Sequence, residues 1–192
     1  MRIVVINHLT LDGVMQGPGR ADEDTRDGFE HGGWSIENID DVIGTALGER
    51  MAESSGLLFG RRTYEDLLAY WNTQESPFKD ALNMARKYVA SRTLREPLPW
   101  PNSSLLEGDV PNAVAGLKNE PGKELQIMGS GELIRSLMPR GLIDEYLLMI
   151  HPLVLGSGRR LFSDGIPTSP LHLVDAKPTT TGVLLATYQP GD

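Results

Sequence analysis

The chain has 192 residues, of which 40% are hydrophobic and 23% are charged. These are ordinary globular values, so they exclude a disordered, collagen-like or coiled-coil chain, and the length predicts one domain over residues 1–192. With 18 Lys and Arg against 26 Asp and Glu, the net charge is −8, which argues against nucleic acid or an anionic membrane as partner. The absence of Cys excludes disulfides and thiolate chemistry. No apolar run suits a signal peptide or a membrane span, so we expect a soluble cytoplasmic protein.

The N-terminal quarter is predicted to contain one strand, one long loop and one helix. Ile3–Ile6 is a β-branched run typical of a strand buried on both faces. The Gly- and Asp-rich segment from Thr10 to about Asn38 has little periodicity, which is typical of a functional loop, and Gly17–Gly19 is its candidate lid. Apolar residues on one helical face then predict a helix over Ile39–Met51, with Asn38 as its N-cap.

The middle of the chain continues to alternate between strand and helix patterns. Asp109, with Pro111 two residues later, is typical of a helix start. Three prolines near position 100 exclude regular structure there. Short strands are predicted at 57–59, 88–90, 104–107 and 125–128, and helices at 64–71, 77–86, about 110–117 and 133–137.

From Glu145 onward the pattern consists of strands alone. Strands are predicted at 146–150 and 153–155, followed by an antiparallel pair at 171–176 and 183–188. The apolar Leu147, Met149 and Leu155 fit either a core or a dimer surface. The whole pattern predicts an α/β fold, with a mostly parallel central sheet flanked by helices and antiparallel C-terminal strands.

Three predicted strands end in polar, Gly-rich or basic segments, and open α/β sheets bind ligands at the carboxyl ends of their strands. Glycines before a helix let a phosphate approach the backbone, although Ile134 stands where a dinucleotide fingerprint needs a third small residue, so an ordinary tight turn remains the alternative. Arginines at a helix start oppose the helix dipole and indicate a bound anion, with solvated side chains as the alternative. The segments are Gly60-Arg61-Arg62-Thr63, Ser91-Arg92-Thr93 and Gly129-Ser130-Gly131-Glu132.

Taken together, three such segments predict a dinucleotide with a 2′-phosphate, and hence NADPH in preference to NADH. Asp12, just after the first strand, is either a turn residue or a substrate contact. Trp34 and Trp71 could stack on a heterocycle, with core packing as the default for Trp71. The four His residues show no ligand spacing, so we expect no metal site.

These motifs also carry a resemblance that covers nearly the whole chain. The sequence resembles the dihydrofolate reductase-like family, and most closely the C-terminal reductase domain of bifunctional riboflavin-biosynthesis deaminase-reductases and its stand-alone relatives. The motifs that occur in this order are Thr10-Leu11-Asp12-Gly13, Gly60-Arg61-Arg62-Thr63-Tyr64-Glu65, Ser91-Arg92-Thr93, Gly129-Ser130-Gly131, Gly141-Leu142-Ile143-Asp144-Glu145, the tail from His151 to Gly158, and Leu161-Phe162.

The resemblance implies a dihydrofolate reductase-like sheet, a homodimer and an NADPH site. Within that site, Ser91 and Arg92 would lie near the 2′-phosphate and adenosine, and Asp12 would lie near the nicotinamide and substrate. Substrate contacts are assigned to Asp12, Trp34 and Tyr64. Cofactor contacts are assigned to Gly13, Gly60, Arg61, Arg62, Thr63, Ser91, Arg92, Gly129, Ser130, Gly131, Glu132 and Leu133.

The resulting hypothesis is an NADPH-dependent reductase of a small polar heterocycle, resembling 5-amino-6-(5-phosphoribosylamino)uracil reductase. Asp12 is the first candidate for the proton donor, which would require a raised pKa, and Asp41 is the second. One alternative is a non-catalytic NADPH-binding protein, and another is a dihydrofolate reductase proper. In dihydrofolate reductases a substrate-binding carboxylate precedes the second strand; here that position falls near Gly44, with Asp40 and Asp41 about a turn away.

Overall fold

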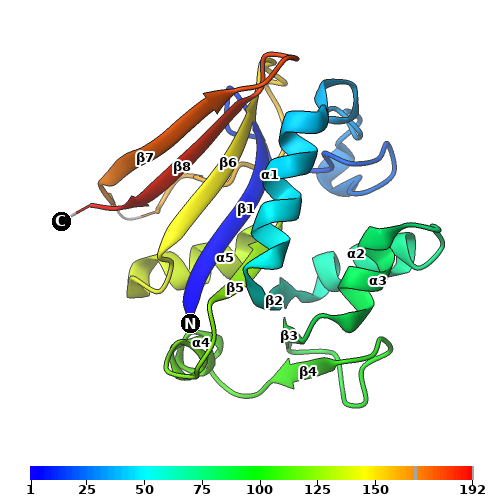
Figure 1. Ribbon diagram of the computed structural model, residues 1–192, viewed down its shortest axis with the longest axis vertical. Coiled ribbons are helices and arrows are strands. Elements are labelled where there is room, and N and C mark those ends of the chain that lie inside the picture. The colour runs from blue at the N-terminus through cyan, green and yellow to red at the C-terminus, as the bar shows by residue number, and fades with distance from the viewer. Residues whose placement is uncertain (167, 192) are drawn as a thin grey trace. The chain divides into compact units, whose positions relative to one another are not determined.

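The computed structural model describes residues 1–166 and 168–191, and its strands form one eight-stranded α/β sheet flanked by helices (Figure 1). The strand order is β4-β3-β2-β5-β1-β6-β8-β7. A mostly parallel sheet with antiparallel C-terminal strands confirms the predicted fold class. The strands are β1 (Arg2–Thr10), β2 (Ser54–Gly60), β3 (Lys87–Ala90), β4 (Ser103–Leu106), β5 (Glu124–Met128), β6 (Glu145–His151), β7 (Leu171–Pro178) and β8 (Leu184–Pro190). The α-helices are α1 (Asp41–Ala52), α2 (Arg61–Trp71), α3 (Pro77–Met84), α4 (Val110–Lys118) and α5 (Gly131–Leu137), with 3₁₀ turns at Arg26–Gly28, Ile36–Asn38 and Met138–Arg140.

The chain divides into two compact units. Unit 1 comprises Met1–Val4 and Glu53–Ile143, and unit 2 comprises Val5–Ala52 and the chain from Asp144 onward. Each unit buries its own apolar side chains, such as Leu57 and Leu125 in unit 1 and Leu148 and Leu161 in unit 2. Within the described residues, no helix combines the length and apolarity that a bilayer crossing needs.

Unit 1 contains four parallel strands. β2 pairs with β3 and with β5, and β3 pairs with β4. The apolar run Leu57–Phe59 is fully buried within β2, which confirms the short strand predicted there. Because β2 and β3 are parallel and in register, with Gly60 opposite Ala90, their carboxyl ends lie at the same edge of the sheet.

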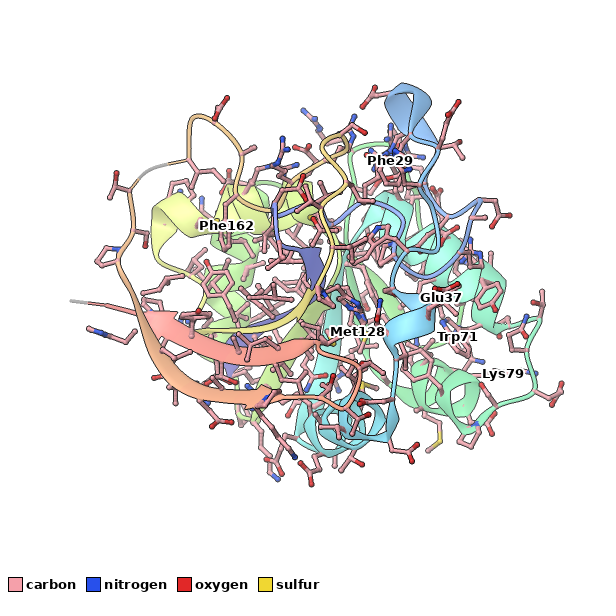
Figure 2. All side chains as sticks on the ribbon, turned by 90° about the horizontal axis from the view of Figure 1, so that it is seen from above. Phe29, Glu37, Trp71, Lys79, Met128 and Phe162 are labelled. Carbon is pink, nitrogen blue, oxygen red and sulfur yellow. The ribbon has the colours of Figure 1, made fainter. Side chains whose placement is uncertain are left out.

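The helices of unit 1 begin where the sequence supplies capping groups. The Asp109 carboxylate accepts a hydrogen bond from the backbone N–H of Asn112 at 3.0 Å, which confirms the predicted start of α4. Figure 2 labels Trp71, which lies at the end of α2. Its ring and that of Phe78 in α3 pack edge-on, with ring centroids 4.8 Å apart. This contact accords with the default of core packing for Trp71.

The end of α3 is fixed by a buried lysine. Lys87 is fully buried, and its Nζ donates to the carbonyl oxygens of Leu82 at 2.6 Å and Ala85 at 2.7 Å. Burial lowers the pKa of Lys87 to about 8. Because a cation at a helix C-terminus satisfies carbonyls that have no helical partner, Lys87 joins α3 to β3.

Unit 2 ends in three antiparallel strands, with β8 between β6 and β7 (Figure 1). The predicted antiparallel pair of C-terminal strands is confirmed, and its register shifts between Leu173 and Asp175. Leu147 and Met149 of β6 are buried within the unit, which assigns them to its core. β7 is the last strand in the sheet order and is exposed along almost its whole length.

Two local predictions were wrong. The segment 153–155 is not a strand, because after Pro152 the chain turns and Leu153 N–H donates to the His151 carbonyl at 2.8 Å. The N-cap of α1 is Asp40 rather than Asn38, since the Asp40 carboxylate accepts from the Ile43 N–H at 3.0 Å. An aspartate caps as well as an asparagine does, so the apolar spacing alone could not choose between them.

Candidate functional site

Unit 1 brings the ends of β2 and β5 into contact. The Ser130 hydroxyl accepts a hydrogen bond from the Gly60 backbone N–H at 3.0 Å, across 70 residues of sequence. A Cβ placed on Gly129 would lie 3.4 Å from Cγ2 of Thr63, at ordinary contact distance. Gly60, Thr63, Gly129 and Ser130, which we call the strand-end cluster, therefore come together as the strand-end prediction requires.

The turn in this cluster has an unusual backbone. Gly129 has φ +61°, and Ser130 has φ 60° and ψ 48°, so two successive residues are left-handed. A non-glycine residue in this region costs about 1–2 kcal/mol. The bond from Gly60 N–H to the Ser130 hydroxyl offsets part of that cost and fixes the chain where α5 begins at Gly131.

The arginines of unit 1 differ in their partners. Arg61 pairs with Glu65 at 3.1 Å, one helical turn along α2, which partly offsets its unfavourable place at the helix start. Arg62, in the first turn of α2, and Arg92, two residues after β3, are exposed. Neither guanidinium has a hydrogen bond or an ion pair within the described residues. These two side chains are therefore available to an anion.

The other cofactor contacts predicted in unit 1 are partly committed to structure. The Ser91 hydroxyl accepts from the N–H groups of Thr93 at 3.1 Å and Leu94 at 3.0 Å, so it stabilises its own turn. Glu132 pairs with Arg135 at 2.6 Å. The side chain of Leu133 is buried, which leaves only its backbone for a ligand.

Tyr64 is a core residue. Its side chain is 0% exposed, Trp100 packs edge-on against it at 4.9 Å, and its hydroxyl accepts from the Trp100 N–H at 3.4 Å. This burial argues against the substrate contact that the sequence analysis assigned to Tyr64.

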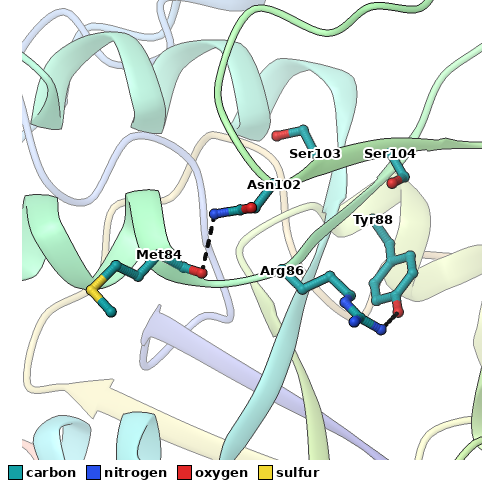
Figure 3. Close-up of a pocket in the computed structure, with 6 residues that line it drawn as sticks. All are labelled: Met84, Arg86, Tyr88, Asn102, Ser103 and Ser104. Carbon is teal, nitrogen blue, oxygen red and sulfur yellow. Dashed lines mark hydrogen bonds between the residues drawn. The ribbon is translucent and has the colours of Figure 1, made fainter.

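A polar hollow of about 540 Å³ also lies in unit 1 (Figure 3). It is found at the start of β3 and β4, whereas Ser91 and Arg92 follow the end of β3. The guanidinium of Arg86 donates to the Tyr88 hydroxyl at 3.3 Å in this hollow. The hollow is therefore separate from the strand-end cluster. Its lining residues are Met84, Arg86, Tyr88, Asn102, Ser103 and Ser104.

In unit 2, Asp12 is held by a set of hydrogen bonds. Its carboxylate accepts from the Thr10 hydroxyl at 2.6 Å and from the backbone N–H groups of Leu155 at 3.2 Å and Gly156 at 2.9 Å, and Arg160 lies 3.3 Å away. The Thr10 hydroxyl is the largest influence, and with the backbone donors it lowers the pKa of Asp12 to about 2. A carboxylate in this state remains ionised at neutral pH, which argues against the proton-donor role.

Unit 2 also contains three other predicted features, namely Gly13, Asp41 and the candidate lid at Gly17–Gly19. Gly13 has φ +80° and closes the turn after β1 by donating to the Thr10 carbonyl at 2.9 Å. Asp41 is exposed in the first turn of α1, where an acid suits the helix dipole. The candidate lid is tied down, because Gly33 N–H donates to the Gly17 carbonyl at 2.7 Å and Ser35 N–H donates to the Pro18 carbonyl at 3.1 Å.

Trp34 belongs to a cluster that the sequence analysis missed. Its indole N–H donates to the Gln16 carbonyl at 2.7 Å, and its ring packs edge-on against His151 with centroids 5.2 Å apart. His151 in turn contacts His8, with Nε2 of His151 2.8 Å from Nδ1 of His8. The two histidines are 143 residues apart, so no local pattern could have linked them. Within the described residues, no group of three or more His, Asp or Glu side chains is arranged to hold a metal ion.

Comparisons with known proteins agree with this architecture. Residues 2–185 match the family model of the RibD C-terminal domain. A solved structure from Shewanella sp. PV-4, described as a riboflavin biosynthesis protein, aligns over 100% of both chains with a TM-score of 0.74 and 21% identity.

Two further solved structures share the fold. Dihydrofolate reductase from Enterococcus faecalis, complexed with NADP(H), aligns over 100% of this chain and 97% of its own with a TM-score of 0.64 and 12% identity. A diaminohydroxyphosphoribosylaminopyrimidine deaminase/5-amino-6-(5-phosphoribosylamino)uracil reductase from Thermotoga maritima aligns over 99% of this chain and 56% of its own, with a TM-score of 0.64 and 14% identity. The dihydrofolate reductase-like fold is thereby confirmed, and the chain belongs to the RibD C-terminal domain family.

Proposed function

We propose that this protein is an NADPH-dependent reductase of a small polar heterocycle of the ribosylamino-pyrimidine class. Membership of a family of riboflavin-pathway reductases supports the reaction type. The observation that supports this cofactor is that the guanidinium groups of Arg62 and Arg92, in the segments that follow β2 and β3 of unit 1, have no partner within the described residues. The related fold from Enterococcus faecalis, which was solved with NADP(H), agrees with this choice.

The residues of unit 1 fit the cofactor in charge and in backbone shape. Guanidinium groups bind phosphate oxygens in pairs, so Arg62 and Arg92 suit the 2′-phosphate that distinguishes NADPH from NADH. The backbone of Gly129–Gly131 would hold the diphosphate, because glycines before a helix let a phosphate approach the main chain closely. When bound, NADPH supplies the hydride, and the protein supplies orientation and electrostatics.

Unit 2 offers the residues proposed for the substrate. Trp34 is half-buried and presents an aromatic ring that suits a planar heterocycle. Asp12 stays ionised and holds the loop at Leu155 and Gly156, so it can accept a hydrogen bond from a substrate N–H or O–H group but cannot supply a proton.

Two alternatives make different predictions. A dihydrofolate reductase proper needs a carboxylate that binds the pterin. The two acids of α1, Asp41 and Glu49, are both exposed, which argues against this role for them. A non-catalytic NADPH-binding protein is favoured by one observation, the ionised state of Asp12, because it removes the first candidate for the proton donor.

One experiment separates the three functions. NADPH is titrated into the protein by calorimetry, and its oxidation is then followed by absorbance with ribosylamino-pyrimidine, dihydrofolate and simple carbonyl acceptors. The proposal expects NADPH binding and turnover with the pyrimidine, but not with dihydrofolate. Binding without turnover of any acceptor would support the non-catalytic alternative, and the absence of NADPH binding would overturn the proposal.

We also propose that the protein forms a homodimer through β7. This strand is at the end of the sheet order and exposes the apolar Leu173 and Val174, which are 56% and 55% accessible. An exposed edge strand with apolar side chains favours pairing with a second chain. Sedimentation should give a dimer for the natural protein and a monomer for Val174→Lys; a natural protein that sediments as a monomer would contradict the proposal.

A further inference from the structure

Unit 2 contains a pair of histidines at the ends of two strands. His8 lies two residues before the end of β1, and His151 is the last residue of β6. Nδ1 of His8 lies 2.8 Å from Nε2 of His151, and the rings are tilted by 45°. A contact of this length is a hydrogen bond, so one proton is held between the two nitrogens and each ring fixes the tautomer of the other.

The pair is uncharged at neutral pH. Burial lowers the pKa of both imidazoles, and the neighbouring His151 lowers the pKa of His8 further. Within the described residues, His151 is the one ionisable group that shifts the pKa of His8, and no charged group shifts the pKa of His151. His151 also makes an edge-to-face contact with the Trp34 ring, with centroids 5.2 Å apart. Among the residues that the structure describes, no carboxylate therefore stabilises a permanent positive charge on the pair.

Packing alone does not explain this arrangement. His151 is 0% exposed, yet its Nδ1 has no hydrogen-bond partner within the described residues. A buried polar atom without a partner is destabilising, and such atoms in native proteins call for an explanation. An apolar side chain at position 151 would avoid this cost, so packing does not account for an imidazole here.

The other ring leaves one nitrogen open. His8 is half-buried, and its Nε2 has no hydrogen-bond partner within the described residues, although its Nδ1 is engaged by His151. The ring is thus held at one nitrogen and available at the other. That is how an oriented histidine acts on a bound molecule in many enzymes.

We propose that Nε2 of His8 donates the proton that the substrate takes up in the reduction, and that His151 is the residue that positions it. This inference rests on the proposed reductase function. It replaces Asp12 and Asp41 as candidates for the proton donor. Asp12 accepts three hydrogen bonds from Thr10, Leu155 and Gly156, whereas His8 carries a nitrogen that is free to exchange a proton.

The proton balance of the step is simple. A solvent proton first charges the pair, so that His8 carries hydrogens on both nitrogens and donates Nδ1–H to His151. As hydride from NADPH forms a bond to the carbon of a C=N or C=O group, the π electron pair moves to the nitrogen or oxygen. That atom takes the Nε2 proton of His8, and the pair returns to its neutral form. Throughout the step His151 keeps its own hydrogen on Nδ1, so it needs no change of tautomer.

This step predicts a pH dependence. Because burial keeps the pair neutral at pH 7, its protonated fraction grows about tenfold for each unit by which the pH falls toward its pKa. kcat should therefore rise as the pH falls from 7 toward the pKa of the pair.

The test compares three substitutions in the full chain, with turnover of the ribosylamino-pyrimidine and NADPH affinity as readouts. His8→Gln should lower kcat by about 10²- to 10⁴-fold and abolish the rise of kcat with acidity, while NADPH affinity stays unchanged. His151→Phe should lower kcat and shift the pH profile, because His8 loses its hydrogen-bond partner. In His151→Gln an amide replaces the imidazole, and its hydrogen bond to His8 should restore part of the activity. His31→Gln, which alters an exposed histidine of the same unit, is the matched control and should leave both readouts unchanged.

A second measurement does not depend on turnover. Nitrogen-15 spectra of the histidine side chains should show His8 and His151 titrating as a coupled pair well below the ordinary histidine range. The inference is overturned if His8→Gln keeps kcat within about threefold of the natural value, or if the two rings titrate independently near pH 6.5. If the natural protein binds NADPH but reduces no acceptor, the proposed function itself fails, an outcome distinct from an active His8→Gln variant.

Discussion

The hydroxyl of Ser130 is the best single point at which to test how the strand-end cluster is held together. Ser130 is buried, is left-handed at φ 60°, and accepts the Gly60 N–H at 3.0 Å. Ser130→Ala removes the acceptor and leaves a part-buried N–H unpaired, which costs about 1–3 kcal/mol, while the backbone strain remains. Ser130→Gly loses the same bond but relieves the left-handed strain, so it should be less destabilised by about 1 kcal/mol.

The assay is urea unfolding of the natural protein and the two variants, with the free energy of unfolding as the quantity compared. We expect the order natural, then Ser130→Gly, then Ser130→Ala, with similar denaturant slopes. NADPH should bind both variants more weakly, because Gly60 is no longer tied to the start of α5. A Ser130→Ala variant within about 0.5 kcal/mol of the natural protein would show that the Ser130 hydroxyl contributes little to the cluster. A glycine variant less stable than the alanine variant would show that the left-handed backbone at position 130 is not strained.

Two further predictions concern the loop that holds Asp12. In Gly158→Ala the new Cβ would lie 2.7 Å from the Phe29 ring and 2.8 Å from Val14, at φ +113°, so this variant should lose much more stability than Gly156→Ala, where φ is +75° and nothing lies within 4 Å. Equal thermal shifts for the two would contradict the predicted clash. The lowered pKa of Asp12 means that its contribution to stability is complete above about pH 4 and is lost as the pH falls through about 2. Asp12→Asn should therefore be less stable than the natural protein at pH 7 and nearly as stable at pH 2, and a difference that does not change with pH would show that Asp12 is not stabilised as an anion.

Local sequence patterns predicted most of the secondary structure, because those patterns reflect contacts within one element. The apolar spacing of α2 and the turn between β7 and β8 are examples. The observed bounds of this helix and these two strands lie within a few residues of the predicted ones. The error at 153–155 arose because strand propensity cannot show that Pro152 and the His151 carbonyl turn the chain.

Candidate site residues could be predicted only where the neighbouring sequence determines their role. The glycines at 129 and 131 and the uncommitted Arg62 and Arg92 could be proposed from strand ends alone. The state of Asp12 could not, since its carboxylate is set by N–H groups of Leu155 and Gly156, which lie 143 and 144 residues further along the chain. The His8–His151 pair was missed for the same reason, because metal-ligand spacing was the one pattern applied to histidines.

Calorimetric titration of Arg62→Ala with NADPH and NADH tests most directly whether Arg62 and Arg92 bind the 2′-phosphate of NADPH. One charge-assisted hydrogen bond contributes about 1.5–3 kcal/mol, so NADPH should bind about 10- to 150-fold more weakly. NADH affinity should be nearly unchanged, and Arg140→Ala, which alters an exposed arginine paired with Asn112, should change neither. Equal weakening of both coenzymes by Arg62→Ala, or no heat from NADPH with the natural protein, would contradict a 2′-phosphate site at Arg62 and Arg92.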